Sequence, residues 1–350
     1  MKASRLLRAR GQTGLTLVEL MISLAIGLFL VAAVAGVYIA ARNVFVVTHS
    51  ATIMDENART AFAWIGNGIR QARFDGCRGS DGAIVGDTRR GAFTDWWNDI
   101  GNPVRGYSLS ATDSRFANSV ANSDALTLIG IDSSRETTVV SDDPASATIT
   151  TGRHAFANGE TLLVTDCQLN SLFIKTGGSA GGGSTQTIVH GATLNCSAAL
   201  GDACANGGSG SASYTLNPGA LIVPLVANAY YVAPASNADK GRSLWNTTTE
   251  VGGGLSAREL VGGVERLAFR FAVDTDGDGS INGYLAPTAI TDWTQVKAVQ
   301  VRLLLATLPD SGAKSTGSNA YTFNGATITP AAGDRRIYRE YTAIFSLRNQ

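Results

Sequence analysis

The chain has 350 residues, of which 44% are hydrophobic and 16% charged, with 28 basic and 28 acidic side chains. This composition excludes a disordered chain, and the absence of a Lys/Arg-rich block after the first ten residues argues against a nucleic-acid binder. Forty glycines against eight prolines indicate many turns between short strands, so most of the chain is expected to be β-rich.

A short basic leader and a long apolar run open the chain. The leader carries four positive charges, Lys2, Arg5, Arg8 and Arg10, and residues 20–41 contain no charged side chain. A helix of that length spans about 33 Å, close to the thickness of a bilayer core. If this run is a membrane anchor, the positive charges hold the leader in the cytoplasm and everything after residue 42 lies on the other side.

An ordinary secretory signal peptide is the alternative for this segment. Such a peptide has a basic start, an apolar core of about 7–15 residues and a small-residue cleavage site, which "AVAG" at residues 33–36 imitates. Two features disagree with it, because the apolar run continues to Ala41 and a carboxylate, Glu19, stands near its start. An ionisable residue at a membrane boundary normally marks a function with a partner.

The motif "GLTLVEL", residues 14–20, lies between the leader and the apolar run. It resembles the class III signal of type IV pilins and type II secretion pseudopilins. The resemblance implies that a prepilin peptidase removes a leader of residues 1–14 by cutting between Gly14 and Leu15, and that Leu15 becomes the N-methylated terminus. It also implies that Glu19 is the glutamate at the fifth mature position and that residues 15–41 form a transmembrane or filament-core helix.

Elementary electrostatics predicts an assembly role for Glu19. A cut after Gly14 creates an α-ammonium on Leu15, at the end of a helix with no polar partner of its own. In an apolar bundle an unpaired charge is costly, whereas a charge paired with one on a neighbouring copy is tolerated and fixes the register. The alternative is a frayed helix end whose carboxylate reaches the lipid headgroups.

The helix is expected to continue beyond the apolar run. Residues 42–74 place apolar side chains at three- and four-residue intervals among polar neighbours, which predicts an amphipathic continuation of the helix to about Phe74. A glycine-rich turn at residues 74–82 would then end it. The predicted stripe consists of Val44, Val47, Ala51, Met54, Ala58, Ala61, Ile65 and Ala72, widened by Phe62 and Ile69.

Residues 75–350 are expected to form one globular, mainly antiparallel β domain, possessing one or two sheets. The fold class is therefore α+β and pilin-like, with a long N-terminal helix packed on the sheet. Strand-like runs alternate with turn signals along this part of the chain. The runs are residues 124–132, 160–167, 170–176, 184–192, 219–233, 264–274, 293–307 and 336–349.

The last part of the chain resembles one particular group of pilin-like proteins. "ELVGGVERLAFRFAVDTDGDGSINGY" (259–284), the run at 293–305 and "YTAIFSLRN" (341–349) are similar to PilW-type minor pilins, whereas residues 82–217 match nothing specific. The resemblance implies a minor pilin that joins other minor pilins and the major pilin, primes type IV pilus assembly and sits at the pilus tip beside a tip adhesin. The alternatives are a type II secretion pseudopilin and a secreted calcium-binding adhesin whose signal peptide is cut after Ala35.

The stretch "DTDGDGSIN", residues 274–282, is a candidate calcium loop. It places Asp274, Asp276 and Asp278 at alternate positions, Gly279 at a sharp turn, Ser280 where a backbone carbonyl serves, and Asn282 at the ninth position.

Hard oxygen donors suit Ca²⁺, which would pin the connection between two strands in a structural role. Leu285 replaces the bidentate Glu of an EF-hand, and strands rather than helices are expected on both sides. A remote carboxylate such as Asp292 would be needed to complete the shell. The alternative is a solvated Asp-Gly turn.

The four cysteines are Cys77, Cys167, Cys196 and Cys204, with no CxxC spacing and only three histidines in the chain. A zinc site is therefore not expected. An even count behind an N-terminal apolar segment predicts two disulfides in an oxidising compartment such as the periplasm. Cys196 and Cys204 are the easiest pair to close, which leaves Cys77 with Cys167, but other connectivities and free thiols stay open.

These features place the precursor in the inner membrane with its C-terminal domain in the periplasm, and the mature protein in the pilus at the cell surface. No enzymatic function is expected, because the chain has no HExxH or Walker motif. Phe93, Trp96 and Trp97 form an aromatic group that is predicted to lie in the core, with an exposed contact surface as the alternative.

Overall fold

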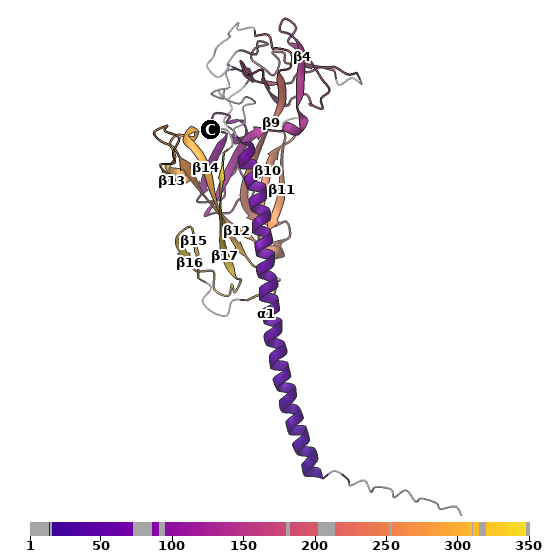
Figure 1. Cartoon of the computed structure of the whole chain (residues 1–350), viewed down its shortest axis with the longest axis vertical. Coiled ribbons are helices and arrows are strands. Elements are labelled where there is room, and N and C mark those ends of the chain that lie inside the picture. Colours follow the sequence, from indigo (N-terminus) through magenta and orange to yellow (C-terminus); the bar gives the residue numbers. More distant parts are fainter. Residues whose placement is uncertain are drawn as a thin grey trace, which may run out of the picture.

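The computed structural model describes residues 14, 16–72, 86–90, 95–179, 183–201, 214–251, 254–309, 311–314 and 320–347. One long helix, α1 (Leu17–Gln71), has its C-terminal half packed on a β-rich body and its N-terminal half projecting away from it (Figure 1). Its 55 residues correspond to a length of about 82 Å. The helix with its antiparallel sheets confirms the predicted α+β fold.

The first turn of α1 is capped by its own sequence. Thr16 has extended backbone, and its hydroxyl oxygen accepts a hydrogen bond from the backbone N–H of Glu19 at 3.3 Å. Thr-x-x-Glu is the capping-box pattern, and a carboxylate in the first turn is favourable at the positive end of the helix dipole. The helix start is therefore specified locally, without help from the β-rich body.

The helix ends at Gln71, three residues before the predicted end. Ala72 takes extended backbone and forms a β-bridge with Gly130, so the chain leaves the helix where it meets a strand of the body. A Cβ at Gly130 would lie 2.4 Å from the carbonyl oxygen of Gln71, and only glycine allows this approach. The predicted glycine-rich turn at 74–82 lies outside the described residues.

The two halves of α1 have different surroundings. From Leu17 to His49 the side chains are exposed except for two that are half-buried, and the buried stripe begins at Ser50. The predicted start of the stripe was wrong, because Val44 and Val47 are 66% and 39% exposed. They lie below the body, where none of the described residues buries them. The buried part of the stripe consists of Met54, Ala58, Ala61, Ile65 and Ile69, followed by Ala72.

The lower part of the body contains two antiparallel sheets. The strands of the first are β2 (Val104–Leu109), β3 (Ser123–Ile131), β9 (Leu221–Pro234), β10 (Arg242–Thr249) and β11 (Leu255–Gly262), paired in that order. The strands of the second are β13 (Gly283–Leu285), β12 (Val264–Val273), β14 (Val296–Ala306) and β17 (Tyr338–Ser346), also in order across the sheet. A small hairpin, β15 (Tyr321–Phe323) and β16 (Ala326–Ile328), lies near β17.

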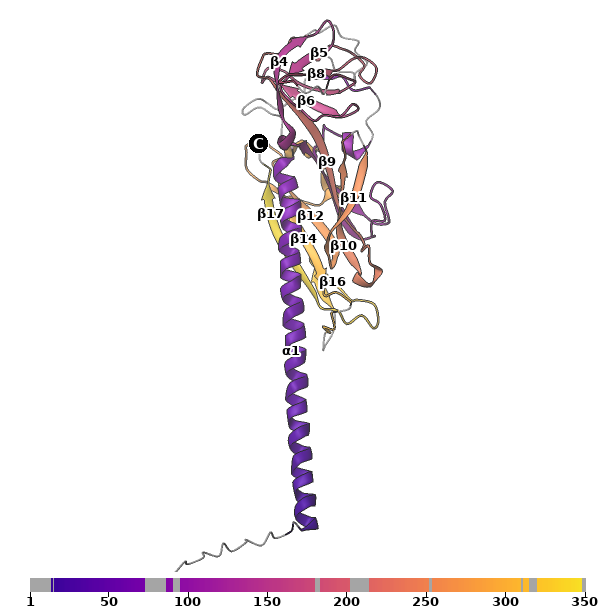
Figure 2. The same cartoon turned by 90° about the vertical axis from the view of Figure 1, so that its right-hand side faces the viewer.

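The upper part of the body has a core of its own. Its strands are β1 (Gly86–Asp87), β4 (Thr137–Asp143), β5 (Thr148–Thr151), β6 (Thr161–Thr165), β7 (Asn170–Ile174) and β8 (Gln186–Val189). The first residues of β9 pair with β6 and β4, and its later residues pair with β3 and β10. This one strand therefore runs through both parts, as Figure 2 shows. Short 3-10 helices lie at Trp96–Asn98, Ser133–Arg135, Ala238–Lys240, Pro287–Ala289 and Trp293–Gln295.

The second half of α1 packs along the opening between the two lower sheets. It contacts β17 and β14 on one side and β11 and β3 on the other, an arrangement visible in Figure 1. Ile65 and Ile69 are completely buried there, and full burial of such a side chain contributes about 1.5–3 kcal/mol. Gly66 allows close contact between α1 and β17, since a Cβ at this position would meet the ring of Phe345 at 2.4 Å.

Candidate functional site

The processing segment lies at the free end of α1. Gly14 is exposed, and a Cβ built on it meets nothing within 4 Å. Leu15 lies outside the described residues, so cleavage between Gly14 and Leu15 and methylation of Leu15 stay predictions. The space around Gly14 means that the fold itself does not require glycine at this position.

Glu19 is exposed in the first turn of α1, and only its backbone is engaged. Its N–H donates to Thr16, and its carbonyl oxygen accepts from the hydroxyl of Ser23 at 2.7 Å. Within the described residues the side-chain carboxylate has no hydrogen-bond or ion-pair partner. It is therefore available to a group from another molecule. Thr16, which positions this turn, was missed as a functional residue, although its Thr-x-x-Glu spacing was a readable signal.

The exposed half of α1 forms a continuous apolar surface. Among the residues that the structure describes, α1 is the one helix long and apolar enough to cross a membrane, and none of its most apolar window is buried. Its large apolar side chains are exposed on every face of the helix, as Leu17, Met21, Leu28, Phe29, Val37 and Phe45 illustrate. Apolar surface on this scale marks a membrane or protein contact.

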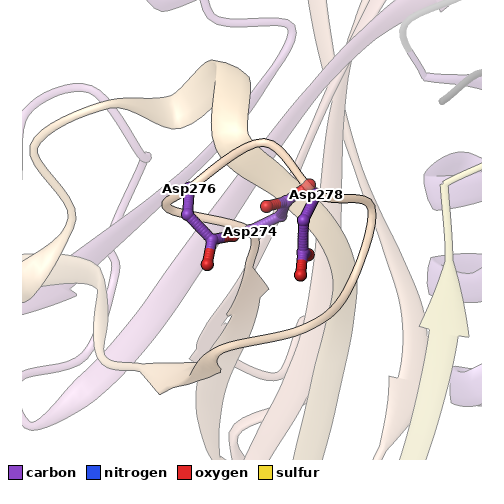
Figure 3. Close-up of side chains that lie close together, drawn as sticks. All are labelled: Asp274, Asp276 and Asp278. Carbon is purple, nitrogen blue, oxygen red and sulfur yellow. The ribbon is translucent and has the colours of Figure 1, made fainter.

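Three carboxylates meet in the loop between β12 and β13 (Figure 3). Oxygens of Asp274, Asp276 and Asp278 all lie within 4.8 Å of one another, and no other group of three such ligand residues occurs in the described chain. Asp274 is buried, while Asp276 and Asp278 are exposed. The loop joins two antiparallel strands, so the site differs from an EF-hand in the way expected from the sequence.

Asp274 is the anchor of this loop. Its carboxylate accepts backbone N–H groups of Gly277 at 2.8 Å and Gly279 at 3.0 Å, and both glycines have positive φ. Burial acts to raise the pKa of Asp274, but these two hydrogen bonds, with contributions from Asp276 and Lys297, leave it below its ordinary value. The Lys297 ammonium lies 3.6 Å from the carboxylate. It comes from the neighbouring strand β14, a contact that the local sequence pattern did not reveal.

The other predicted ligands lie in the same loop with different contacts. The N–H of Ser280 donates to Asp278 at 2.7 Å, and the Asn282 amide donates to Asp276 at 3.1 Å. The amide oxygen of Asn282 accepts the N–H of Thr275 at 2.6 Å. Asp292 is not part of the carboxylate group and instead caps a 3-10 helix by accepting the N–H of Thr294 at 2.9 Å.

Both cysteines in the described part of the chain, Cys167 and Cys196, are disulfide-bonded. Cys77 and Cys204 lie outside the described residues. The predicted pairing of Cys77 with Cys167 and of Cys196 with Cys204 therefore remains a prediction.

Two members of the predicted aromatic group, Trp96 and Trp97, lie in different surroundings. Trp96 is 3% exposed and packs in a core cluster, whereas Trp97 is half-buried and lines a cavity of about 550 Å³ at the junction of the upper and lower parts. Phe93 lies outside the described residues. Two arginines that line this cavity are paired with carboxylates: Arg89 with Asp87 and Arg135 with Glu160.

The ion pair of Arg135 with Glu160 at this cavity was not anticipated from the sequence. Glu160 is 7% exposed, and burial raises its pKa, although the N–H of Ala157 and the charge of Arg135 oppose the rise. The two residues are 25 positions apart, Arg135 in a 3-10 helix and Glu160 directly before β6, so no local motif connects them. Their mutual pairing joins the start of β6 to the 3-10 helix after β3.

Comparison with known families gives two matches at the two ends of the chain. Residues 229–349 match the family model of type IV pilus-assembly protein W, and residues 9–35 match the prokaryotic N-terminal methylation motif. The first contains the carboxylate loop and β17, and the second contains Gly14 and Glu19. Neither the curated proteins nor the solved structures gave a significant match.

Proposed function

We propose that the chain is a PilW-type minor pilin with a class III signal, as the two family matches support, and that it primes assembly of the type IV pilus. In this proposal a prepilin peptidase cuts the precursor between Gly14 and Leu15 and Leu15 is methylated. The mature protein then joins other minor pilins and the major pilin in a complex at the pilus tip, beside a tip adhesin.

The observation that carries the proposal is the bare first half of α1, with the Glu19 carboxylate at its end. An apolar helix exposed on all sides is stable in a bilayer or in a bundle of similar helices, and not in water. In a bundle, Glu19 requires a positive partner, because an unpaired charge among apolar side chains is costly. The α-ammonium created on Leu15 of an adjacent subunit supplies such a charge.

We place the helix in the inner membrane before assembly, with the β-rich body in the periplasm. The positive leader supports this orientation, and the oxidised Cys167 and Cys196 support an oxidising compartment. The family that matches is described as a pilus-assembly protein, so we propose a structural and not an enzymatic role.

Two alternative functions are consistent with part of this evidence. A type II secretion pseudopilin would have the same architecture, but the matching family is described by pilus assembly. A secreted calcium-binding adhesin cut after Ala35 would lose residues 17–35 of α1, which runs without a break through that position. Mass spectrometry of the mature amino terminus separates them: methyl-Leu15 supports the pilin and pseudopilin functions, and a chain that starts at Gly36 supports the adhesin.

Substitution of Glu19 by Ala tests the proposal. The Thr16 cap uses the backbone N–H of Glu19, so the variant keeps the capping hydrogen bond and loses the side chain beyond Cβ, with its charge. We expect normal processing and loss of piliation. Ser23→Ala, one turn further along the same exposed face, is the matched control and should assemble. Wild-type piliation of Glu19→Ala would refute the assembly role, and scoring protein secretion alongside piliation tests the pseudopilin alternative.

We also propose that the loop of Asp274, Asp276 and Asp278 binds a structural Ca²⁺. The support is the convergence of their oxygens within 4.8 Å and the preference of Ca²⁺ for clustered oxygen donors. The alternative role, a turn closed by its own hydrogen bonds, is supported by the N–H groups that Asp274 accepts. The response of stability to calcium decides between them.

A further inference from the structure

Strand β17 is the outermost strand of its sheet. The sheet has the order β13, β12, β14, β17, and within the described part of the chain only β14 pairs with β17. The register between them runs from Ala298 opposite Ser346 to Ala306 opposite Tyr338 without a shift. The edge is therefore regular over its whole length. Figure 2 shows β17 at the margin of the body, beside α1.

The hydrogen bonds at the two ends of β17 show which backbone groups face outward. The carbonyl of Ile337 accepts from Thr307 at 2.9 Å, and the N–H of Leu347 donates to Lys297 at 3.0 Å, so both residues point toward β14. In an antiparallel pair successive residues alternate in direction. The N–H and C=O groups of Thr342, Ile344 and Ser346 consequently face away from β14, toward the open edge.

The upper half of this edge lacks the usual protection. Natural proteins guard exposed edges with charges, prolines or bulges. The lower half of β17 carries Arg339 and Glu340, and Glu340 is engaged by Arg302 at 3.2 Å and by the N–H of Asn324 at 3.2 Å. Residues 342–346 carry no charge and no proline, and Ile344 is 52% exposed. An open, uncharged, regular edge is a template for a further strand.

The same strand is fixed to the assembly helix. Phe345 packs against Gly66 and Phe62 of α1, and Tyr341 hydrogen-bonds to Asp55 at 2.5 Å. Subunits whose helices lie side by side must place their bodies side by side too. The open edge is therefore continuous with the surface by which α1 meets its neighbours, and the molecule brought closest to it by assembly is another pilin-type subunit.

We propose that residues 342–346 of β17 pair with an edge strand of an adjacent pilin-type subunit, so that the four-stranded sheet continues across the subunit boundary. This inference rests on the proposed function, because it takes the helix-to-helix contact as the event that brings the edges together. The backbone supplies the pairing, and Ile344 supplies an apolar contact on the outer face.

Thr342→Pro is the direct test, made in the full-length protein in piliated cells. Proline removes an N–H that faces the open edge and leaves the pairing with β14 untouched, as edge positions allow. We expect normal processing and at least a tenfold reduction in co-purified pilin subunits. Thr342→Val keeps the N–H and the branched side chain, and it should match the wild type. Wild-type co-purification of Thr342→Pro would overturn the proposal.

A second measurement does not depend on the folding of the proline variant. A photo-crosslinking residue placed at Ile344 should form an adduct with a pilin-type subunit in cells, whereas the same residue at Val140, exposed on β4 of the upper part, should not. No adduct at Ile344, or an equal adduct at Val140, would overturn the proposal. If either crosslinking result is obtained while Glu19→Ala still abolishes piliation, the edge-pairing proposal is wrong and the proposed function is still supported.

Discussion

The hydroxyl of Tyr341, on β17, donates a hydrogen bond to the carboxylate of Asp55, on α1, at 2.5 Å. The guanidinium of Arg339 approaches the same carboxylate at 3.2 Å. The pKa of Asp55 lies below its ordinary value, chiefly because of the Tyr341 hydrogen bond. Burial opposes this shift, and the charge and hydrogen bond of Arg339 add to it. These contacts tie the helix to the edge of the sheet at the level where α1 enters the body.

Tyr341→Phe should lower stability at neutral pH and have less effect in acid. A carboxyl whose pKa is lowered by folding contributes stability above its unfolded pKa, near 4, and this contribution is lost as the pH falls through the folded value. We expect the melting temperature of the detergent-solubilised chain to fall by about 2 °C at pH 7. The gap to the wild type should narrow as the pH falls below about 4. Tyr284→Phe, exposed on β13, is the control, and a gap that stays constant with pH would contradict the assignment.

Gly14→Leu should leave the precursor uncut. Since a side chain at this position meets nothing within 4 Å in the folded chain, any defect must arise in recognition by the peptidase. Mass spectrometry of the purified protein should show the intact leader, with the melting temperature unchanged. Gly27→Leu, on the exposed helix with equally open surroundings, should be processed. Normal cleavage of Gly14→Leu would exclude the proposed site.

Calcium should raise the melting temperature through the loop after β12. A ligand present at 100 times its dissociation constant stabilises the folded state by about 2.7 kcal/mol. Combined replacement of Asp276 and Asp278 by Ala should abolish this rise and leave the stability without calcium nearly unchanged, because both side chains are exposed. Asp239→Ala, exposed in the 3-10 helix Ala238–Lys240, should keep the response. A calcium response that survives the double replacement would remove the site.

Gly130→Ala should destabilise the body by about 1–3 kcal/mol, the usual cost of overpacking. The new methyl group would lie 2.4 Å from the Gln71 carbonyl oxygen, a backbone atom that cannot rotate away. The free energy of unfolding in denaturant measures the loss. Gly36→Ala, on an open part of α1, should show none, and equal stability of the two variants would show that the helix end is not held against β3.

The long helix and the main strands were predictable because their patterns are local. Each of the eight strand-like runs overlaps an observed strand, since alternation of apolar and polar side chains reports a half-buried strand directly. The start of the buried helical stripe was not predictable. Val44 and Val47 repeat with the same period as Met54, and their exposure depends on where the body ends.

Several strands were not predicted because their composition or irregular pairing obscures the two-residue alternation of apolar and polar side chains. Thr137–Asp143 and Thr148–Thr151 are rich in Thr and Asp, which also signal turns. In Leu255–Gly262 the pairing with β10 skips Leu260, between Val261 opposite Leu244 and Glu259 opposite Trp245, so the two-residue period is interrupted.

The candidate sites were also predictable only where the sequence pattern is local. The positions of Gly14, Glu19 and the three aspartates follow from motifs. The contacts of Asp274 with Lys297 and of Asp55 with Tyr341 join residues far apart in the chain, and only the fold reveals them.

The length of β9 has a mechanical consequence. This strand of 14 residues is shared by the upper and lower parts of the body and runs roughly along the long axis of the molecule (Figures 1 and 2). Hydrogen bonds between antiparallel strands lie perpendicular to the strands. Tension that draws the upper part away from the membrane end therefore loads the bonds of β9 with β3 and β10 together, in shear, instead of opening them one after another. A body built in this way transmits traction from its upper part to its lower part through one continuous strand.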